Sequence, residues 1–521
     1  MSYPTEKSYP TEKHLSEKDA TVTSVIPEDQ VAHLKGENAA VEDVILAEQS
    51  YTEEEYKKLR WRFDLILMPI MMLTYGLQFA DKVSLSSGVV FGLKTDTKLK
   101  GDEYSLLTVY FYCAYLAGQI PMSYIFQKLP IGRALGGTVI LWGIVVIGLG
   151  LCNNYLQLSM CRVLLGWMEC AVTPGFLLIV ASWYKRSEAT LRSCMYFAMN
   201  TFLGGCFNVI IYAIAKKAAA DGGIAGWRAI NFFLGSLTVF AGILVFIFIG
   251  IPSDVWWLNK EQKKMAHSRI VSNGTGDAGR HAWTWSQVKE CFRDPQYYFI
   301  ILFNLTATIP NGVLTTFTAL VYTGFGFTAL QSILYQLPSS AIGFCVIISS
   351  AVTVTFFPKM RFPLAITWTL LEMIVFLYVG LAKTASKWQL WGAFSFSSVI
   401  SCATFLVWAI LPLNTAGRTK KSFTGASALI AYCTGNMIGS QTMRASDAPR
   451  YLKGLTGNAI VMAINALILL SWWIYLQREN KKRDQAYEAS GLSMEEREYQ
   501  NKVAGETDVT DRQNPHFRYL C

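Results

Sequence analysis

Charged residues inside two strongly apolar stretches are the part of this sequence best suited to chemistry. Asp81 and Lys82 lie near the end of the first stretch, which begins at Asp64. Arg162 and Glu169 lie in another stretch, and because they are seven residues apart they share one face of a helix. A charge inside an apolar segment is costly unless it is paired or functional. These stretches therefore predict a membrane protein that moves a small anion together with a proton.

The composition argues against a soluble protein. Hydrophobic residues make up 52% of the 521 residues and charged residues only 16%. A soluble enzyme carries more charge, whereas repeated apolar stretches of about 20 residues, each long enough to cross a bilayer, explain these values. The net charge of +9 could suggest nucleic acid as a partner. We expect none, because the basic residues cluster in short loops, as the positive-inside rule predicts.

Twelve apolar spans predict twelve transmembrane helices. The spans are 63–84, 104–126, 135–152, 156–181, 192–215, 228–251, 297–320, 331–356, 363–382, 388–411, 423–443 and 454–476. Six spans, a long basic loop and six more spans predict an all-α secondary transporter of two six-helix bundles, with its site between them near the midplane. Pro310, Asn311 and Gly312 predict an interruption of the seventh span, and Pro338 and Gly343 predict one in the eighth.

This count of spans divides the chain into five parts. The polar residues 1–58, in which SYPTEK occurs twice, predict a disordered cytosolic tail. The bundles occupy 59–251 and 297–476, and a basic cytosolic loop at 252–296 joins them. Residues 477–521 form a charged cytosolic tail. Most basic loops then lie on the side of both tails, although three loops on the other side also carry Lys or Arg.

Signatures of other protein classes are missing from the sequence. It has no Walker A pattern, which argues against ATP-driven pumping, and its spans hold no nucleophile–histidine pair, so we do not expect an enzyme. The 11 cysteines form no CxxC or Cys/His cluster. We therefore expect neither disulfides nor a metal site, and no cofactor.

Seven short motifs follow one another along the chain. They are Phe79-Ala-Asp81-Lys82; Arg162-x3-Gly166-x2-Glu169-x4-Pro174; Trp183-Tyr184-x3-Glu188-x3-Arg192; Ile309-Pro-Asn311-Gly312; Asn414-x2-Gly417-x-Thr419-Lys420-Lys421; Gly435-Asn436-x2-Gly439-x-Gln441; and Asp508-x2-Asp511-x2-Asn514-Pro-x-Phe517-Arg518-Tyr519. Through them, residues 50–521 resemble the major facilitator superfamily. The resemblance is closer to its anion:cation symporter branch, in the fungal allantoate permease-like group.

The sequence departs from these families at two places. The superfamily usually has G-x-x-x-D-R-x-G-R after the second span, but the stretch from Ser123 to Arg133 lacks the acidic residue. The gating contact of that acid is therefore expected to be altered or absent. Ser440 stands where the allantoate permease-like group often has Pro. Signatures of drug:proton antiporters and sugar porters are missing, which favours a symporter of small polar solutes.

Proton coupling needs a group that gains and loses a proton during the transport cycle. All five histidines lie in the tails or the central loop, so carboxylates must carry the proton if the driving ion is H⁺. The resemblance implies this role for Asp81 and Glu169. The alternative is structural: Asp81 neutralises Lys82 or Arg162, and Glu169 neutralises Arg162. Glu372, in the ninth span, matches no motif, and we expect it to be satisfied within its own bundle.

An anionic substrate in a dry cavity needs a cation, and Lys82 and Arg162 are the cations available within the spans. The resemblance implies that Lys82 contacts the substrate; the alternative is that its side chain extends to the membrane interface. Arg162 is expected to link Glu169 to the gate. Further polar candidates for the substrate site are Tyr115, Asn200, Asn311, Asn436 and Gln441. Tyr115 and Asn436 match family positions near substrate, whereas contacts between helices are an equal alternative for the other three.

We therefore predict proton-coupled uptake, or symport, of a small organic anion across the plasma membrane by alternating access. The resemblance implies ureido acids, other carboxylates, acidic vitamins or sulfur-containing organic acids as substrates. Uncoupled facilitated diffusion or exchange, and a non-transporting nutrient sensor, are the alternatives. We expect a multi-pass monomer with both termini in the cytosol.

Overall fold

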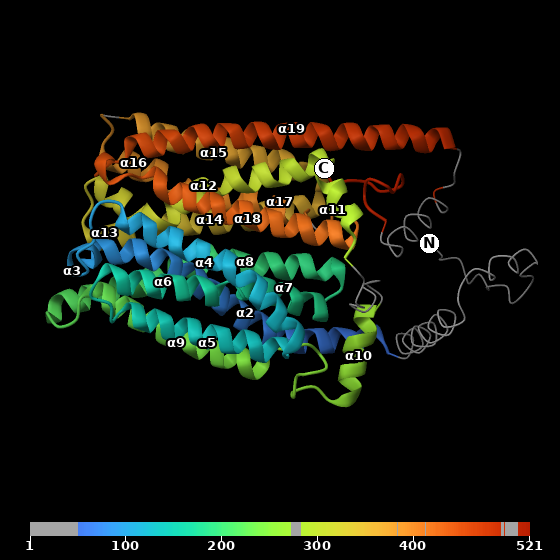
Figure 1. Cartoon of the computed structure of the whole chain (residues 1–521), viewed down its shortest axis with the longest axis horizontal. Helices are drawn as coiled ribbons and strands as arrows, with labels where there is room; N and C mark the ends of the chain where they lie inside the picture. Colours follow the sequence, from blue (N-terminus) through green and yellow to red (C-terminus); the bar gives the residue numbers. More distant parts are fainter. Residues whose placement is uncertain (1–50, 272–282, 383, 412, 491–493, 495–508) are drawn as a thin grey trace, which may run out of the picture.

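Long α-helices lie side by side along the molecule, as Figure 1 shows. The computed structural model describes residues 51–271, 283–382, 384–411, 413–490, 494 and 509–521. Most of the tail expected at 1–58 lies outside these described residues. The described residues contain no strand, and the predicted all-α fold of two six-helix bundles is confirmed.

The first half of the chain forms one bundle. Its helices are α2 (Glu53–Val90), α3 (Leu93–Asp96), α4 (Glu103–Lys128), α5 (Ile131–Leu149), α6 (Tyr155–Glu169), α7 (Val172–Trp183), α8 (Arg186–Asp221) and α9 (Gly226–Phe248). Helix α5 packs along α9, α4 along α6, and α2 along α8. The short α3 follows the first span, and α6 and α7 together form the fourth, so this bundle has six spans.

The second half forms a matching bundle. Its helices are α12 (Pro295–Gly324), α13 (Ala329–Leu334), α14 (Leu337–Phe356), α15 (Arg361–Leu381), α16 (Lys387–Phe394), α17 (Ile400–Trp408), α18 (Arg418–Thr442) and α19 (Leu452–Ser490). Helix α12 packs along α18, and α15 along α19. Three 3₁₀ turns lie between these helices, at Pro358–Met360, Ser397–Val399 and Ala445–Asp447.

Ten helical stretches among the described residues are long and apolar enough to cross a membrane. The two other long helices are α4, with 26 residues, and α18, with 25. Both fall short of that apolarity, and they pack against each other between the bundles. Together these stretches account for the twelve predicted spans.

The segment expected as the central loop contains two helices of its own, and the first and last membrane helices extend into the segments expected as tails. Helices α10 (Lys260–Val271) and α11 (Trp285–Cys291) lie within 252–296. Helix α10 packs against α2 and α7, whereas α11 packs against α18, so the connecting segment divides between the two bundles. At the start of the first span, α2 begins at Glu53 because Thr52 and Glu55 form a capping box.

The fourth, eighth and tenth spans are interrupted helices, and only the interruption of the eighth was predicted. The predicted interruption of the seventh span is wrong, because α12 runs unbroken through Pro310; proline is tolerated in membrane helices whose freed backbone groups find other partners. The eighth span is interrupted between α13 and α14, just before Pro338, and not at Gly343. The fourth and tenth spans are also divided, at Cys170–Ala171 and between α16 and α17.

The bundles meet at the end of the molecule that carries α3 and α13, here called the closed end (Figure 1). The backbone nitrogen of Ala319 donates to Ser86 Oγ at 3.0 Å, and Thr108 and Thr316 share a hydrogen bond of 3.2 Å between their hydroxyls. Tyr104 donates its hydroxyl to the carbonyl of Thr316. Hydrogen bonds between buried neutral groups therefore hold this end together.

Two glycines of the sequence motifs allow helices to approach closely. A Cβ at Gly166 of α6 would clash with the backbone oxygen of Phe111 on α4. A Cβ at Gly439 of α18 would clash with the backbone oxygen of Ile309 on α12. Since backbone cannot yield as a flexible side chain does, these positions accept only glycine at the present helix spacing.

We predict that Gly439→Ala destabilises the fold by about 1–3 kcal/mol, because the methyl group overpacks the contact between α18 and α12. Thermal unfolding of the purified protein in detergent measures this change. The control is Gly425→Ala on the same helix, where a Cβ meets no atom within 4 Å; it should be neutral or stabilising by about 0.5–1 kcal/mol. Equal effects of the two substitutions would contradict this account.

Candidate functional site

A cavity lies between the two bundles, at mid-length of α4, α8, α12 and α18. Its polar and aromatic lining comes from both bundles: Tyr75, Gln78, Phe79, Lys82, Tyr115, Thr173 and Asn200 from the first, and Thr308, Asn311, Thr315, Ser401, Thr404, Phe405, Trp408 and Tyr432 from the second. Of the described residues that line it, Lys82 alone carries a charge. The cavity is thus a largely neutral, polar and aromatic space with one cation in its wall.

Lys82 forms a buried ion pair with Glu169. Its Nζ lies 2.6 Å from Glu169 Oε1, and the side chain of Glu169 has no exposed surface, whereas that of Lys82 is 16% exposed. The ammonium also lies 5.8 Å from the ring centre of Phe111 and 6.0 Å from that of Tyr115, within range of cation–π attraction. Because α2 continues to Val90, Lys82 is not at a helix end, and its side chain does not extend to an interface.

A break in the fourth span places Glu169 at this site. Pro174 lacks a backbone N–H and its ring crowds the carbonyl of Cys170, four residues earlier. Helix α6 therefore ends at Glu169, and α7 begins at Val172. Gln119 Nε2 donates to the freed carbonyl of Cys170 at 3.1 Å. Irregular backbone of this kind is tolerated at membrane depth where it borders a cavity or protein.

Asp81 and Arg162 form a second charged site beside the first. Asp81 is fully buried, and Trp142 Nε1 donates to its Oδ2 at 3.4 Å. Arg162 is 6% exposed, and its positive charge acts on the Asp81 carboxylate. Among the described residues, no hydrogen-bond partner reaches Arg162 Nε. One structural alternative expected from the sequence was that Glu169 neutralises Arg162. The structure differs from it, because Glu169 forms its ion pair with Lys82.

The other candidates from the sequence occupy three different environments. Tyr115, Asn200 and Asn311 line the cavity. Asn436 is buried behind this wall, where its Oδ1 accepts from Asn311 Nδ2 at 2.8 Å. Gln441 lies at the closed end, where Ser105 donates to its side chain at 3.3 Å, so it is placed to join the bundles rather than to line the cavity.

Several lining residues were not anticipated from the sequence. Gln78 could have been found, because it precedes Lys82 by four residues and so shares its helix face. Tyr75 lies a further turn back. Trp408 and Tyr432 stand in spans without any local signal. They reach the cavity only because α17 and α18 pack there, with their rings 5.6 Å apart.

Glu372 is buried in the second bundle, away from this cavity. Its side chain is fully buried, and neither carboxylate oxygen has a hydrogen-bond partner among the described residues. The expected satisfaction within its bundle is therefore not seen as a hydrogen bond. Across all the residues that the structure describes, no three His, Cys, Asp or Glu side chains gather in a way that could hold a metal ion.

The chain is similar to known transporters over nearly its whole length. A model of the Major Facilitator Superfamily matches residues 71–440. Over 532 residues the chain is 31% identical to the allantoate permease of Saccharomyces cerevisiae, covering 98% of this chain and 96% of the relative. It is 30% identical over 522 residues to an uncharacterised transporter of Schizosaccharomyces pombe, with 97% of each covered. A thiamine pathway transporter of S. cerevisiae is 28% identical over 495 residues, with 92% and 90% covered.

Two solved structures share the fold at low sequence identity. The xylose transporter of E. coli, in a partially occluded inward open conformation, has a TM-score of 0.60 and 14% identity, with 78% of this chain and 97% of that chain covered. A bacterial homologue of the human lysosomal transporter Spinster, in an inward-facing and unoccupied conformation, has a TM-score of 0.54 and 13% identity, covering 78% and 95%.

We predict that Lys82→Met lowers the free energy of unfolding by about 3–5 kcal/mol, because it leaves the buried Glu169 without its cation. Adding Glu169→Gln to this variant should restore most of the loss, since the remaining site is neutral. Thermal unfolding of the two single variants and the double variant measures the coupling. Losses that simply add would show that the pair does not stabilise the fold.

Proposed function

This chain belongs to the Major Facilitator Superfamily, in a group of transporters related to fungal allantoate permease, and we propose that it takes up a small organic anion together with a proton. It is a multi-pass membrane transporter of a small molecule. Symport, the anion as cargo, a plasma-membrane location, a monomeric state and cytosolic termini are the further parts of the proposal.

One observation carries the proposal. Lys82, the one cation among the described residues that line the cavity, already has a buried anionic partner, Glu169. A substrate carboxylate that binds Lys82 must compete with Glu169 for the ammonium. The partner that leaves the ion pair is fully buried. An ionised carboxylate in such surroundings is strongly disfavoured unless it is paired or takes up a proton.

Charge balance then couples the anion to a proton. The Lys82–Glu169 pair is neutral when both groups are ionised. A substrate anion at Lys82 adds one negative charge, and a proton on Glu169 removes it. The loaded site is therefore neutral only when both are bound, and the empty site is neutral when neither is bound. Uncompensated charge is costly in the membrane interior. The protein therefore changes most easily between its outward-open and inward-open conformations in these two states.

The rest of the cavity supports a cargo with a neutral polar body. Asn200, Asn311 and Thr404 offer amide and hydroxyl groups, and Tyr115 and Trp408 offer aromatic surface. Pockets of this kind bind small ligands by apolar contact and fix their orientation with a few polar groups. Ureido acids, other carboxylates, acidic vitamins and sulfur-containing organic acids all combine one acidic group with such a body.

Asp81 and Arg162 are proposed to assist from behind the cavity. Both lie beside the Lys82–Glu169 pair, on α2 and α6 respectively. We assign Asp81 as a second carboxylate that takes part in proton coupling, and Arg162 as the cation that offsets its charge and links the site to the movement of α6. Asn436 supports Asn311 from behind, whereas Gln441 acts at the closed end.

Alkalinisation of a weakly buffered acidic medium by cells that express the chain tests this function. Ureido acids, simple carboxylates, acidic vitamins and sulfonates are added one at a time. The pH of the medium should rise with the transported compound, because each anion enters with a proton. Uptake without a pH rise, insensitive to a protonophore, would instead identify an uncoupled facilitator or exchanger.

We predict that Glu169→Gln abolishes accumulation driven by the pH gradient but retains exchange of substrate across the membrane. For one proton per anion, each pH unit supports about tenfold accumulation, and this dependence should disappear in the variant. Radiolabelled uptake at several external pH values provides the measurement. Glu372→Gln is the control, because Glu372 is also a fully buried glutamate but does not line the cavity; this variant should keep the gradient dependence. Unchanged accumulation in Glu169→Gln would remove Glu169 from the coupling mechanism.

A further inference from the structure

The segment 509–521, here called the strap, folds back onto the second bundle beside α11, at the end opposite the closed end (Figure 1). It forms no helix, yet four of its residues are buried. Thr510 and Asp511 have no exposed surface, and Asn514 and Tyr519 are 4% and 5% exposed. A polar segment with buried residues of this kind occupies a specific site on the second bundle, here called the seat. The residues of the seat that bind the strap include Asn414, Lys420, Asn480 and Arg483.

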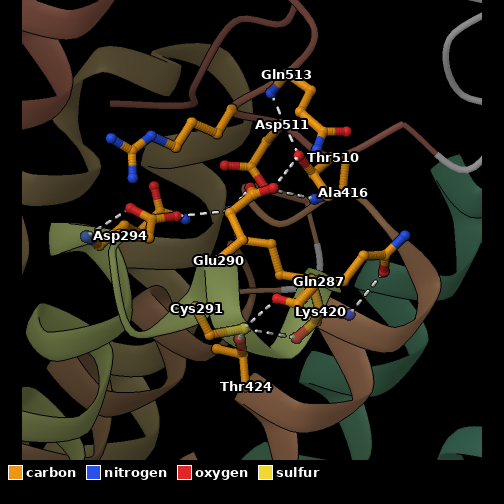
Figure 2. A network of polar contacts seen from close by, with 12 residues as sticks. Gln287, Glu290, Cys291, Asp294, Ala416, Lys420, Thr424, Thr510, Asp511 and Gln513 are labelled. Carbon is orange, nitrogen blue, oxygen red and sulfur yellow. Dashed lines mark hydrogen bonds and ion pairs between the residues drawn. The ribbon is translucent and has the colours of Figure 1, made fainter. Parts of the chain in front are cut away.

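Asp511 of the strap lies in a network of polar contacts with Lys420 and Ala416, as Figure 2 shows. Its Oδ1 lies 3.0 Å from Lys420 Nζ and accepts a hydrogen bond from the backbone nitrogen of Ala416 at 3.1 Å. Its Oδ2 accepts from the Tyr519 hydroxyl at 2.7 Å. Because the side chain of Lys420 is only 2% exposed, this ion pair is screened from water and depends on both partners.

Lys420 joins the strap to the starts of two membrane helices. It lies in the first turn of α18, and its Nζ is 2.6 Å from Asp294 Oδ2 and 3.1 Å from Glu290 Oε1. Asp294 caps α12 by accepting from the backbone nitrogen of Gln296. Thr510 of the strap donates to the other oxygen of Glu290 at 3.0 Å. The ammonium of Lys420 therefore forms ion pairs with carboxylates of α11, of the cap of α12 and of the strap.

Two asparagines hold the backbone of the strap from either side. Asn414 donates to the carbonyl of Leu520 at 3.0 Å and accepts from its backbone nitrogen at 2.8 Å. Asn480 of α19 makes the same pair of bonds with Tyr519, at 2.8 and 3.0 Å. Arg483 of α19 donates to the carbonyl of Phe517 at 2.9 Å. The seat therefore binds the backbone of the strap as well as the side chain of Asp511.

Two of the helices that the strap connects, α12 and α18, also line the cavity. Helix α12 carries Asn311, α18 carries Asn436, and the two residues are hydrogen-bonded at mid-membrane. Their ends near α11 are joined to each other by Lys420 and to α19 by the strap. A fixed arrangement of these ends keeps the relative position of α12 and α18 constant.

We propose that the strap is an intramolecular ligand of this seat, anchored by Asp511, and that its docking keeps α12, α18 and α19 together as one unit. The consequence for transport rests on the function proposed above. The docking itself does not, and it can be measured without a substrate.

Cys521 reports whether the strap is docked. Asn480 Nδ2 lies 3.3 Å from its Sγ, and burial raises the pKa of the thiol from 9.0 to about 11. The thiolate is the reactive form, so a docked Cys521 reacts slowly with an alkylating reagent. Release of the strap returns the pKa of the thiol towards its ordinary value, and a fall of two units in this pKa increases the thiolate fraction about 100-fold near neutral pH.

The experiment compares alkylation of Cys521 by iodoacetamide in the full-length protein and in Asp511→Asn, with the modified peptide quantified by mass spectrometry. We expect an increase in rate towards the 100-fold limit in Asp511→Asn. A smaller increase is expected in Tyr519→Phe, which loses the hydrogen bond that Tyr519 donates to Asp511 and the one it accepts from Arg483 but keeps the Asp511–Lys420 ion pair. Asp484→Asn is the matched control. Its carboxylate pairs with Arg518 of the strap at 2.7 Å but is 54% exposed, so its rate should stay close to that of the parent.

Transport by the same variants, normalised to the amount at the cell surface, completes the test. A several-fold lower maximal rate in Asp511→Asn, with Asp484→Asn unchanged, supports a strap that holds the helices together. Equal alkylation rates in Asp511→Asn and the parent would overturn the docking. Fast alkylation with an undiminished transport rate would overturn the positioning role. If the parent transports no test compound, the alkylation result still decides the docking, and only the proposed function is in question.

Discussion

The buried ion pair of Lys82 and Glu169 is the interaction on which the arrangement of this site depends. Burying two charges costs free energy that only a close partner can offset, so the pair must form wherever these residues meet. It brings together α2 and the broken fourth span, and it leaves the ammonium at the edge of a cavity that both bundles line. The same electrostatic constraint that stabilises the empty site makes it respond to an added anion.

Much of the site could be foreseen because charge is rare within apolar spans. Asp81, Lys82, Arg162 and Glu169 stand out in the sequence for that reason alone. Their partners could not be foreseen, because sequence spacing places Arg162 and Glu169 on one face but cannot tell which side chain from another helix reaches that face. Trp408 illustrates the same limit, since only the packing of the second bundle brings it to the cavity.

The fold was predictable from the apolar pattern of the sequence. The errors in the predicted helix interruptions have a physical origin. Apolar length predicts the spans, although α4 and α18 are less apolar than the ten other stretches. Proline is less informative, because its effect depends on whether neighbours can satisfy the freed backbone. At Pro174 the helix breaks just before it and Gln119 bonds the free carbonyl of Cys170, whereas α12 continues through Pro310. The burial of the strap was also unforeseen, since its polar sequence resembles that of a solvated tail.

The hydrogen bonds of the closed end have a consequence for how the protein responds to its surroundings. Ser86, Thr108 and Thr316 are neutral and buried, so dissolved ions hardly screen the bonds between them, in contrast to exposed ion pairs. The contribution of these bonds to the closed state is therefore nearly independent of ionic strength. We expect this part of the contact between the bundles to be as strong in salty media as in dilute media.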